Sequence, residues 1–287
     1  WFEALIDWLK NNFEPVFDVI SVIINTTTGA LEGALLFLPD YVMVLLLTAL
    51  AWWVASRGVA AFTLIGMGLL TGLEVSLFGT EVAIGMGYWT ITMQTLALIL
   101  TASLFSLLVG IPTGIWAAKN DTVDAIVRPV LDFMQTMPSF VYLIPAVVLF
   151  GLGTVPGVIA TFIFATPPCV RLTNLGIRQV SEEAIEAARS FGSTQSQLLF
   201  KVELPMALPT ILAGVNQTVL LALSMVVVAA LIGSDGLGQP VVEGLTQLQI
   251  GRGFEGGLGI VILAIFLDRI TQAIGERAGA GEATQAA

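Results

Sequence analysis

The sequence contains no histidine and a single cysteine, Cys169, among its 287 residues. The absence of histidine excludes histidine-ligated metal sites and histidine-based acid–base catalysis, and one cysteine cannot form an internal disulfide. Charged residues are also scarce, at 11% against about 25% in ordinary soluble domains. Such a chain has too little polar surface for a water-soluble globule, so we expect the bilayer to be its solvent.

Basic residues are outnumbered, because 11 Lys and Arg stand against 21 Asp and Glu, for a net charge of −10. Nucleic-acid binding needs a basic surface, so we predict no nucleic-acid partner. The carboxylates are scattered rather than paired, so we predict neither a catalytic site nor a metal site. The opening residues lack a basic stretch followed by an apolar core, so we expect no signal peptide.

Long apolar runs predict an all-α, polytopic transmembrane bundle of about seven spans, each near the roughly 20 residues that cross a bilayer. The expected spans are 39–56, 59–78, 89–116, 129–150, 155–175, 208–232 and 256–274. Prolines interrupt the fourth span at Pro138 and Pro145 and the fifth at Pro167 and Pro168. Because proline frees carbonyls that lipid cannot satisfy, we expect both spans to face the protein interior.

Residues 1–38 precede the first span and have mixed character. Apolar residues recur there at helical spacing between acidic ones, with Trp1 and Trp8 as aromatic anchors. This pattern favours an external amphipathic helix at the membrane interface, and an additional packed helix is the alternative. The transmembrane domain then covers residues 39–275, and we expect 276–287 to form a flexible cytoplasmic tail.

The distribution of Lys and Arg predicts the orientation. If the first span runs from outside to inside, nine of the 11 basic residues lie in cytoplasmic segments, and only Lys10 and Arg252 lie outside. Since cations are retained in the cytoplasm, the N-terminus is expected outside and the C-terminus inside. A stretch of polar residues, 181–205, which we call the polar segment, then lies in the cytoplasm.

The polar segment reads SEEAIEAARSFGSTQSQLLFKVELP and predicts two short helices. Ser181 is a good N-cap, and Gly192 supplies the left-handed residue that ends the first helix. Thr194 with Gln197 forms a capping box for a second helix, which we expect Pro205 to close. These signals alone leave two interpretations open, an ordinary solvated loop and a docking surface for a soluble partner.

The spacing within the polar segment resembles the cytoplasmic EAA loop of ABC importer membrane subunits, the element that couples to the ATPase subunits. The matching positions are Glu186, Ala187, Ala188, Gly192, Leu204 and Pro205, with Val202 where isoleucine is usual. The flanks LDFMQTMPSFVYLIPAVVLFGLG, PPCVRLTNLGIRQV and IGSDGLGQPV resemble the glycine betaine/proline betaine permease subgroup. The resemblance runs over residues 88–275.

The resemblance implies a type I ABC importer permease fold. It implies a non-catalytic subunit of an ATP-driven importer for a small compatible solute used in osmoprotection, with glycine betaine or a related quaternary amine expected first. The implied partners are two cytoplasmic ATP-binding subunits, a second permease copy forming a homodimer, an external or periplasmic substrate-binding protein, and the lipid of a bacterial or archaeal inner membrane.

The implied cofactors, ATP and Mg²⁺, would bind to the partner subunits and not to this chain. The sequence contains no G-x-x-x-x-G-K-[ST] pattern, which agrees with an ATPase on a separate polypeptide. A stand-alone secondary transporter or channel for a small solute is the alternative function. Its expected marks are broken helices in corresponding halves, and the sequence has no clear internal repeat.

Seven residues expected at membrane depth, most of them polar or aromatic, are candidates for the translocation path. They are Gln135, Met137, Pro138, Phe140, Tyr142, Asn216 and Gln217. The aromatic faces of Phe140 and Tyr142 would attract a quaternary ammonium group through cation–π interactions. Interhelical hydrogen bonding is the alternative role for the polar members. Asp132 lies close to Arg128 in the sequence, so ion pairing is one explanation for that carboxylate.

Overall fold

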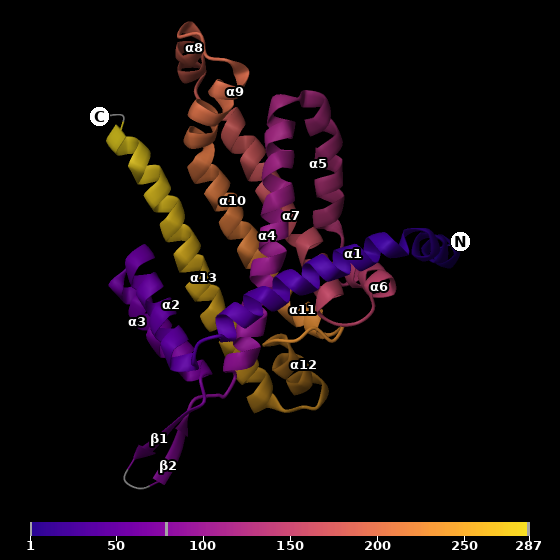
Figure 1. The fold of residues 1–287 in the computed structure, drawn as a ribbon, viewed down its shortest axis with the longest axis vertical. Helices are drawn as coiled ribbons and strands as arrows, with labels where there is room; N and C mark the ends of the chain where they lie inside the picture. The colour runs from indigo at the N-terminus through magenta and orange to yellow at the C-terminus, as the bar shows by residue number, and fades with distance from the viewer. Residues whose placement is uncertain (1, 78–79, 286–287) are drawn as a thin grey trace.

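The computed structural model describes residues 2–77 and 80–285, most of which are helical (Figure 1). Four long helices form the bundle: α4 (Trp89–Lys119), α7 (Thr154–Arg178), α10 (Leu204–Ser224) and α13 (Ile250–Gln285). α7 packs between α4 and α10, and α10 also packs against α13. The other helices are α1 (Phe2–Leu36), α2 (Asp40–Val54), α3 (Arg57–Leu70), α5 (Asp121–Thr136), α6 (Ser139–Phe150), α8 (Glu182–Ser190), α9 (Gln195–Leu198), α11 (Val226–Ala230) and α12 (Gly238–Thr246).

The number of membrane spans is lower than expected, although the all-α prediction is confirmed. Within the described residues, five helical stretches are long and apolar enough to cross a bilayer, or up to six if the bent pair α5 and α6 counts as one. The first two expected spans correspond to α2 and α3, which have 15 and 14 residues. A 15-residue helix reaches about 22 Å, short of the roughly 30 Å of hydrocarbon.

The second expected span, 59–78, is wrong beyond Leu70, where α3 ends. Thr71 adopts an extended conformation, and the chain then forms an antiparallel hairpin of β1 (Leu73–Leu77) and β2 (Thr80–Ile84). Valine and threonine favour strands, and both occur in this stretch. The hairpin extends from the end of the bundle opposite to α8 (Figure 1).

The fourth expected span, 129–150, is divided into α5 and α6, which meet at 98°. The break lies at Met137, whose backbone is extended with ψ 132°, immediately before Pro138. A residue that precedes proline is sterically excluded from the α region, so the helix ends there. Pro145 lies inside α6 instead, and Pro167 and Pro168 lie buried inside α7. The interior position predicted for the fifth span is therefore confirmed. The same prediction for the fourth span is wrong in this chain, because only Leu131, Tyr142, Leu143 and Ala146 of residues 129–150 are buried.

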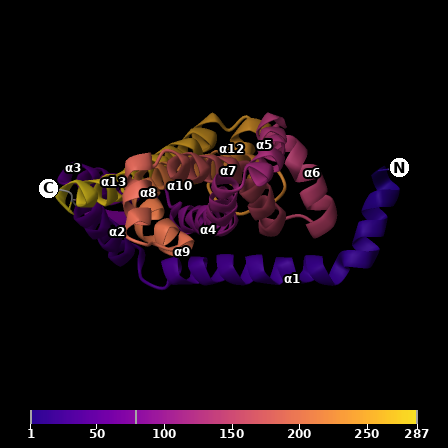
Figure 2. The same cartoon turned by 90° about the horizontal axis from the view of Figure 1, so that it is seen from above.

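The N-terminal segment forms the single helix α1, which runs along one face of the bundle (Figure 2). Its C-terminal half packs on α4 and α7, where Ile24 is buried and the Thr28 hydroxyl donates to Thr101 Oγ1 at 3.2 Å. Gln94 on α4 also donates to the Glu32 carboxylate at 3.0 Å. These contacts favour the packed-helix alternative for this half of α1.

The expected flexible tail at residues 276–287 is helical as far as Gln285. α13 continues as one helix to that residue, past the expected start of the tail at 276. Residues 286 and 287 lie outside the described part of the chain.

Glycines allow α4 and α7 to approach closely. A Cβ added at Gly110 would lie 2.9 Å from Cys169 Sγ, and one at Gly114 would lie 2.7 Å from the Val170 carbonyl oxygen. The two glycines are four residues apart and therefore share one helix face, as in the small-residue contacts of membrane helices. The close approach of α4 to α7 therefore requires that these two positions of α4 carry no side chain.

We predict that Gly114→Ala destabilises the protein by about 1–3 kcal/mol, because the new methyl group meets Thr173 Cβ at 2.6 Å and the Val170 carbonyl oxygen at 2.7 Å, neither of which is the far end of a flexible side chain. Thermal unfolding of the detergent-solubilised protein measures the effect. Gly257→Ala is the matched control, because nothing lies within 4 Å of a Cβ at that helical position. Equal melting temperatures for the two variants would contradict the proposed close contact.

Candidate functional site

The first helix of the polar segment, α8, lies at one end of the molecule (Figure 1). It begins after Ser181, whose Oγ accepts a hydrogen bond from the Ala184 N–H at 3.4 Å. It ends before Gly192, which has φ +79° and donates its N–H to the Arg189 carbonyl at 2.9 Å. Both predicted helix signals are confirmed.

The second helix, α9, begins with the predicted capping box. The Thr194 hydroxyl accepts from the Gln197 N–H at 3.3 Å, and the Gln197 side chain accepts from the Thr194 N–H at 2.9 Å. The prediction that Pro205 closes this helix is wrong. The chain continues through a π-helical turn, η1 (Leu199–Glu203), directly into α10.

The π-helical turn explains how the helix passes Pro205. The Leu204 N–H donates to the Leu199 carbonyl, five residues earlier, so the backbone ladder is already shifted when the proline is reached. Proline also fits the first turn of a helix, because the N–H groups there have no partner within the helix. Pro205 therefore lies in the first turn of α10 and does not end α9.

The six motif residues lie at two places in the polar segment. Glu186 and Ala187 are exposed on α8 and Ala188 is half-buried there, while Gly192 lies in the turn after α8. The remaining motif residues, Leu204 and Pro205, are half-buried at the start of α10. Their part in coupling to a partner stays a prediction, since a single chain does not test it.

Two exposed aromatic side chains accompany the motif and were missed by the sequence reasoning. Phe191, beside Gly192, is 92% exposed, and Phe200, in η1, is 66% exposed. Their signal in the sequence was the presence of phenylalanine within an otherwise polar stretch. Large apolar side chains exposed on a polar surface are typical of protein–protein contact sites.

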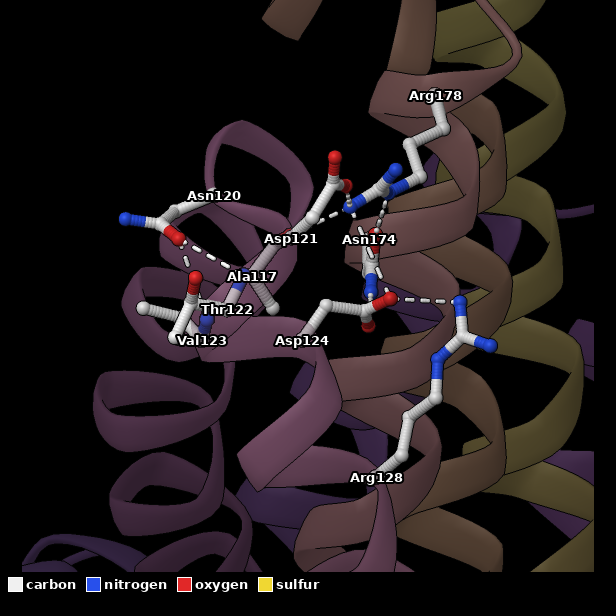
Figure 3. Close-up of polar contacts among 9 residues, drawn as sticks. All are labelled: Ala117, Asn120, Asp121, Thr122, Val123, Asp124, Arg128, Asn174 and Arg178. Atoms are coloured by element: carbon white, nitrogen blue, oxygen red, sulfur yellow. Dashed lines mark hydrogen bonds and ion pairs between the residues drawn. The ribbon is translucent and has the colours of Figure 1, made fainter.

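A network of charged and amide side chains joins α5 to α7 below the polar segment (Figure 3). Asp124 accepts from Asn174 at 2.7 Å and forms an ion pair with Arg128 at 2.7 Å. Arg178, the last residue of α7, pairs with Asp121 at 2.8 Å and lies 3.7 Å from Asp124. The network fixes the beginning of α5 against the end of α7.

The structure assigns a different partner to Asp132 than the sequence suggested. Asp132 pairs with Arg171 of α7 at 2.5 Å, and Arg128 pairs with Asp124 instead. Both Asp124 and Asp132 lie four residues from Arg128, so spacing alone could not select between them. Which aspartate pairs with Arg128 depends on the side of α5 that faces α7.

A second ion pair connects the polar segment to α4. Lys119, the last residue of α4, binds the carboxylate of Glu203, the last residue of η1. Glu203 is only 3% exposed, whereas Lys119 keeps about a third of its side chain exposed. The sequence reasoning missed this pair because 84 residues separate its members.

Five of the seven path candidates gather at the break between α5 and α6. Gln135, Pro138 and Phe140 are exposed, and Met137 is half-buried at the bend. Tyr142 is buried, and its hydroxyl donates to the carbonyl oxygen of Met134 across the break. This hydrogen bond closes the bend, so the buried tyrosine fixes the angle between the two helices.

The other two candidates lie on α10 beside α13. Asn216 donates to Asp268 at 3.1 Å, and its side-chain carbonyl accepts from Thr271. Gln217 is exposed and borders the same groove, of about 480 Å³, between these helices. The predicted path residues thus fall into two groups on different helix pairs. For Asn216, the interhelical hydrogen bonding considered as the alternative is what the structure shows.

The described residues, 2–77 and 80–285, include no group of three or more Cys, Asp or Glu side chains that could hold a metal ion. The single cysteine, Cys169, is fully buried in α7 against α4. The arrangement of the site is that of a protruding helical segment anchored by ion pairs.

Comparisons with known proteins agree with the geometry. A family profile described as "binding-protein-dependent transport system inner membrane component" matches residues 110–279. The glycine betaine transport system permease protein OpuAB of Bacillus subtilis is 49% identical over 272 residues, covering 95% of this chain and 92% of the relative. The glycine betaine/carnitine transport permease protein GbuB of Listeria monocytogenes is 48% identical, covering 97% and 95%.

A further relative is the glycine betaine/proline betaine transport system permease protein ProW of Escherichia coli, 48% identical over 96% of this chain and 74% of its own. Among solved structures, an inward-facing conformation of the MetNI methionine ABC transporter has a chain that matches with a TM-score of 0.59. That match has 20% identity and covers 65% of this chain and 94% of the other. It shows a shared fold.

We predict that Gly192→Val loosens the turn between α8 and α9, because a β-branched side chain is strained at φ +79°. Amide hydrogen exchange within residues 181–198 should become faster. Gly192→Asn is the matched control, because asparagine tolerates the left-handed region better and nothing crowds a Cβ there. Unchanged exchange in the valine variant would contradict the conformational role of this glycine.

Proposed function

Because this chain belongs to the family of binding-protein-dependent transport system inner membrane components, we propose that it is the permease subunit of an ATP-driven importer for glycine betaine or a related quaternary amine. The observation that carries the proposal is the protruding polar segment with its EAA spacing, capped at both of its short helices. The proposed substrate rests on the names of relatives that match nearly the whole chain.

The polar segment is the proposed docking surface for a soluble ATP-binding subunit. Glu186 and Ala187 give a small, exposed face on α8, and Phe191 and Phe200 add two aromatic side chains. Exposed aromatics in such a position act as anchors that fill pockets of a partner. One such subunit would dock on each permease, so a permease homodimer would carry two.

The proposed orientation places the polar segment in the cytoplasm of a bacterial or archaeal cell, in its inner membrane. Lys119, Arg178 and Arg189 all lie at the end of the bundle that carries α8, whereas Arg252 lies near the beginning of α13 at the opposite end (Figure 1). Retention of cations in the cytoplasm supports this direction. The N-terminus is then external and the C-terminus, at the end of α13, is cytoplasmic.

The chain is proposed to be non-catalytic, with ATP and Mg²⁺ bound by the partner subunits. A substrate-binding protein on the external side would deliver the solute. The break between α5 and α6 would form part of the path, because Phe140 is exposed there and its aromatic face suits a quaternary ammonium group. ATP-driven movement of the docked polar segment would switch the path between its two open states.

The function is tested by reconstituting the chain in liposomes with its ATP-binding subunit and substrate-binding protein, and by measuring uptake of radiolabelled glycine betaine. We expect uptake only with enclosed ATP. Phe191→Ala should reduce co-purification of the ATP-binding subunit and uptake by about tenfold, because an interface anchor is lost. Phe37→Ala, which truncates a phenylalanine exposed elsewhere, should leave the co-purification unchanged.

Two outcomes would contradict the proposal. Uptake without ATP would indicate a stand-alone secondary transporter or channel. If the double variant Phe191→Ala/Glu186→Arg still co-purified fully with the ATP-binding subunit, that subunit would have to dock elsewhere. Competition by other methylated amines, in the same assay, ranks the substrates.

A further inference from the structure

The polar segment has few attachments to the bundle. Among residues 181–203, all of which the structure describes, only Leu198 and Glu203 are buried. α8 itself packs on α9 and η1, which belong to the same segment. A force applied to α8 by a docked partner must therefore reach the membrane helices through a small number of contacts.

The backbone connection from the polar segment into α10 is a weak joint. The five residues of η1 depart from the α-helical hydrogen-bond pattern, and Pro205, two residues after η1 ends, has no N–H to donate. π-helical turns inside helices are rare and recur at functional sites. The joint between the polar segment and α10 is consequently less regular than the helices on either side.

The ion pair between Glu203 and Lys119 ties the last residue of this joint to α4. The Glu203 carboxylate is almost fully buried, and the ammonium group of Lys119 is its ion-pair partner. Lys119 is held at the C-terminal end of α4, where the helix dipole favours a cation. The pair links η1 to α4 at the point where α10 begins.

The beginning of the polar segment is linked to the same place. Arg178, three residues before Ser181, donates to the carbonyl oxygen of Ala117 at 2.9 Å and to Asp121 at 2.8 Å (Figure 3). Ala117 lies near the end of α4 and Asp121 begins α5. Both ends of the segment are thus fastened to residues 117–121, which we call the α4–α5 corner.

We propose that the α4–α5 corner is the receiver of the movement of the polar segment, and that Lys119–Glu203 and Arg178–Asp121 make segment and corner move as one body. Displacement of the corner tilts α5 and acts on the break between α5 and α6. Lys119 and Glu203 are positioning residues in this account, which rests on the proposed function of the polar segment.

The experiment compares Lys119→Met, Glu203→Gln, the double variant and the charge swap Lys119→Glu/Glu203→Lys, each assembled with the ATP-binding subunit and substrate-binding protein in liposomes. Radiolabelled glycine betaine uptake and phosphate release are measured together, which gives the solute transported per ATP hydrolysed. Co-purification and melting temperature are recorded for each variant. The matched control is Arg171→Met, which breaks an ion pair between α5 and α7 that includes no residue of the α4–α5 corner.

We expect each single variant to retain the ATP-binding subunit and basal ATP hydrolysis, while the transport-to-hydrolysis ratio falls by about fivefold or more. The charge swap should recover most of the ratio, and Arg171→Met should leave it unchanged. A ratio equal to wild type in the single and double variants overturns the proposal, as does a loss confined to melting temperature and assembly.

The charge swap and the double variant keep the test decisive if a single variant fails to fold, because neither leaves an unpaired buried charge. Failure of the underlying function has a different signature. It would appear as a wild-type chain that neither binds the ATP-binding subunit nor transports with ATP, before any variant is compared.

Discussion

The attachment of a charged, protruding segment to an apolar bundle is the constraint on which the rest of this structure depends. Only two side chains of residues 181–203, a stretch described in full, are buried, and one of them is the carboxylate of Glu203. Its pairing with Lys119 joins the segment to α4, and Arg178 joins the preceding residues to Ala117 and the beginning of α5. Because a buried charge tolerates little separation from its partner, the pair of Glu203 with Lys119 holds the end of the segment in one position.

The bundle below the segment is suited to transmit movement. Glycines at 110 and 114 bring α4 against α7 with backbone in contact, and the Asp124 network holds α5 to the same helix. Close-packed helices shift as units and do not deform gradually. A movement of the α4–α5 corner would therefore arrive at the break of α5 and α6, where Tyr142 fixes the bend.

Local signals in the sequence predicted local structure well. The caps at Ser181, Gly192 and Thr194 depend on neighbouring residues, and the structure confirms them. The effect of proline was predicted correctly at Pro138, which breaks a helix. It was predicted wrongly at Pro205, which lies in the first turn of α10 after a π-helical turn. The difference lies in the backbone ladder that precedes each proline. Partners distant in sequence, such as Lys119 and Glu203, and the choice of Asp124 over Asp132 by Arg128 depend on packing, which no spacing rule supplies.

The most direct test is a distance measurement on the assembled importer by double electron–electron resonance. Spin labels are placed at Thr122 and Ser196, both exposed, in a Cys169→Ala background. On ATP binding, the distance between Thr122 and Ser196 within one chain should stay constant, while the distance between the Ser196 labels of two permease copies changes. If the intrachain distance changes as much as the distance between copies, the segment and the corner do not move as one body.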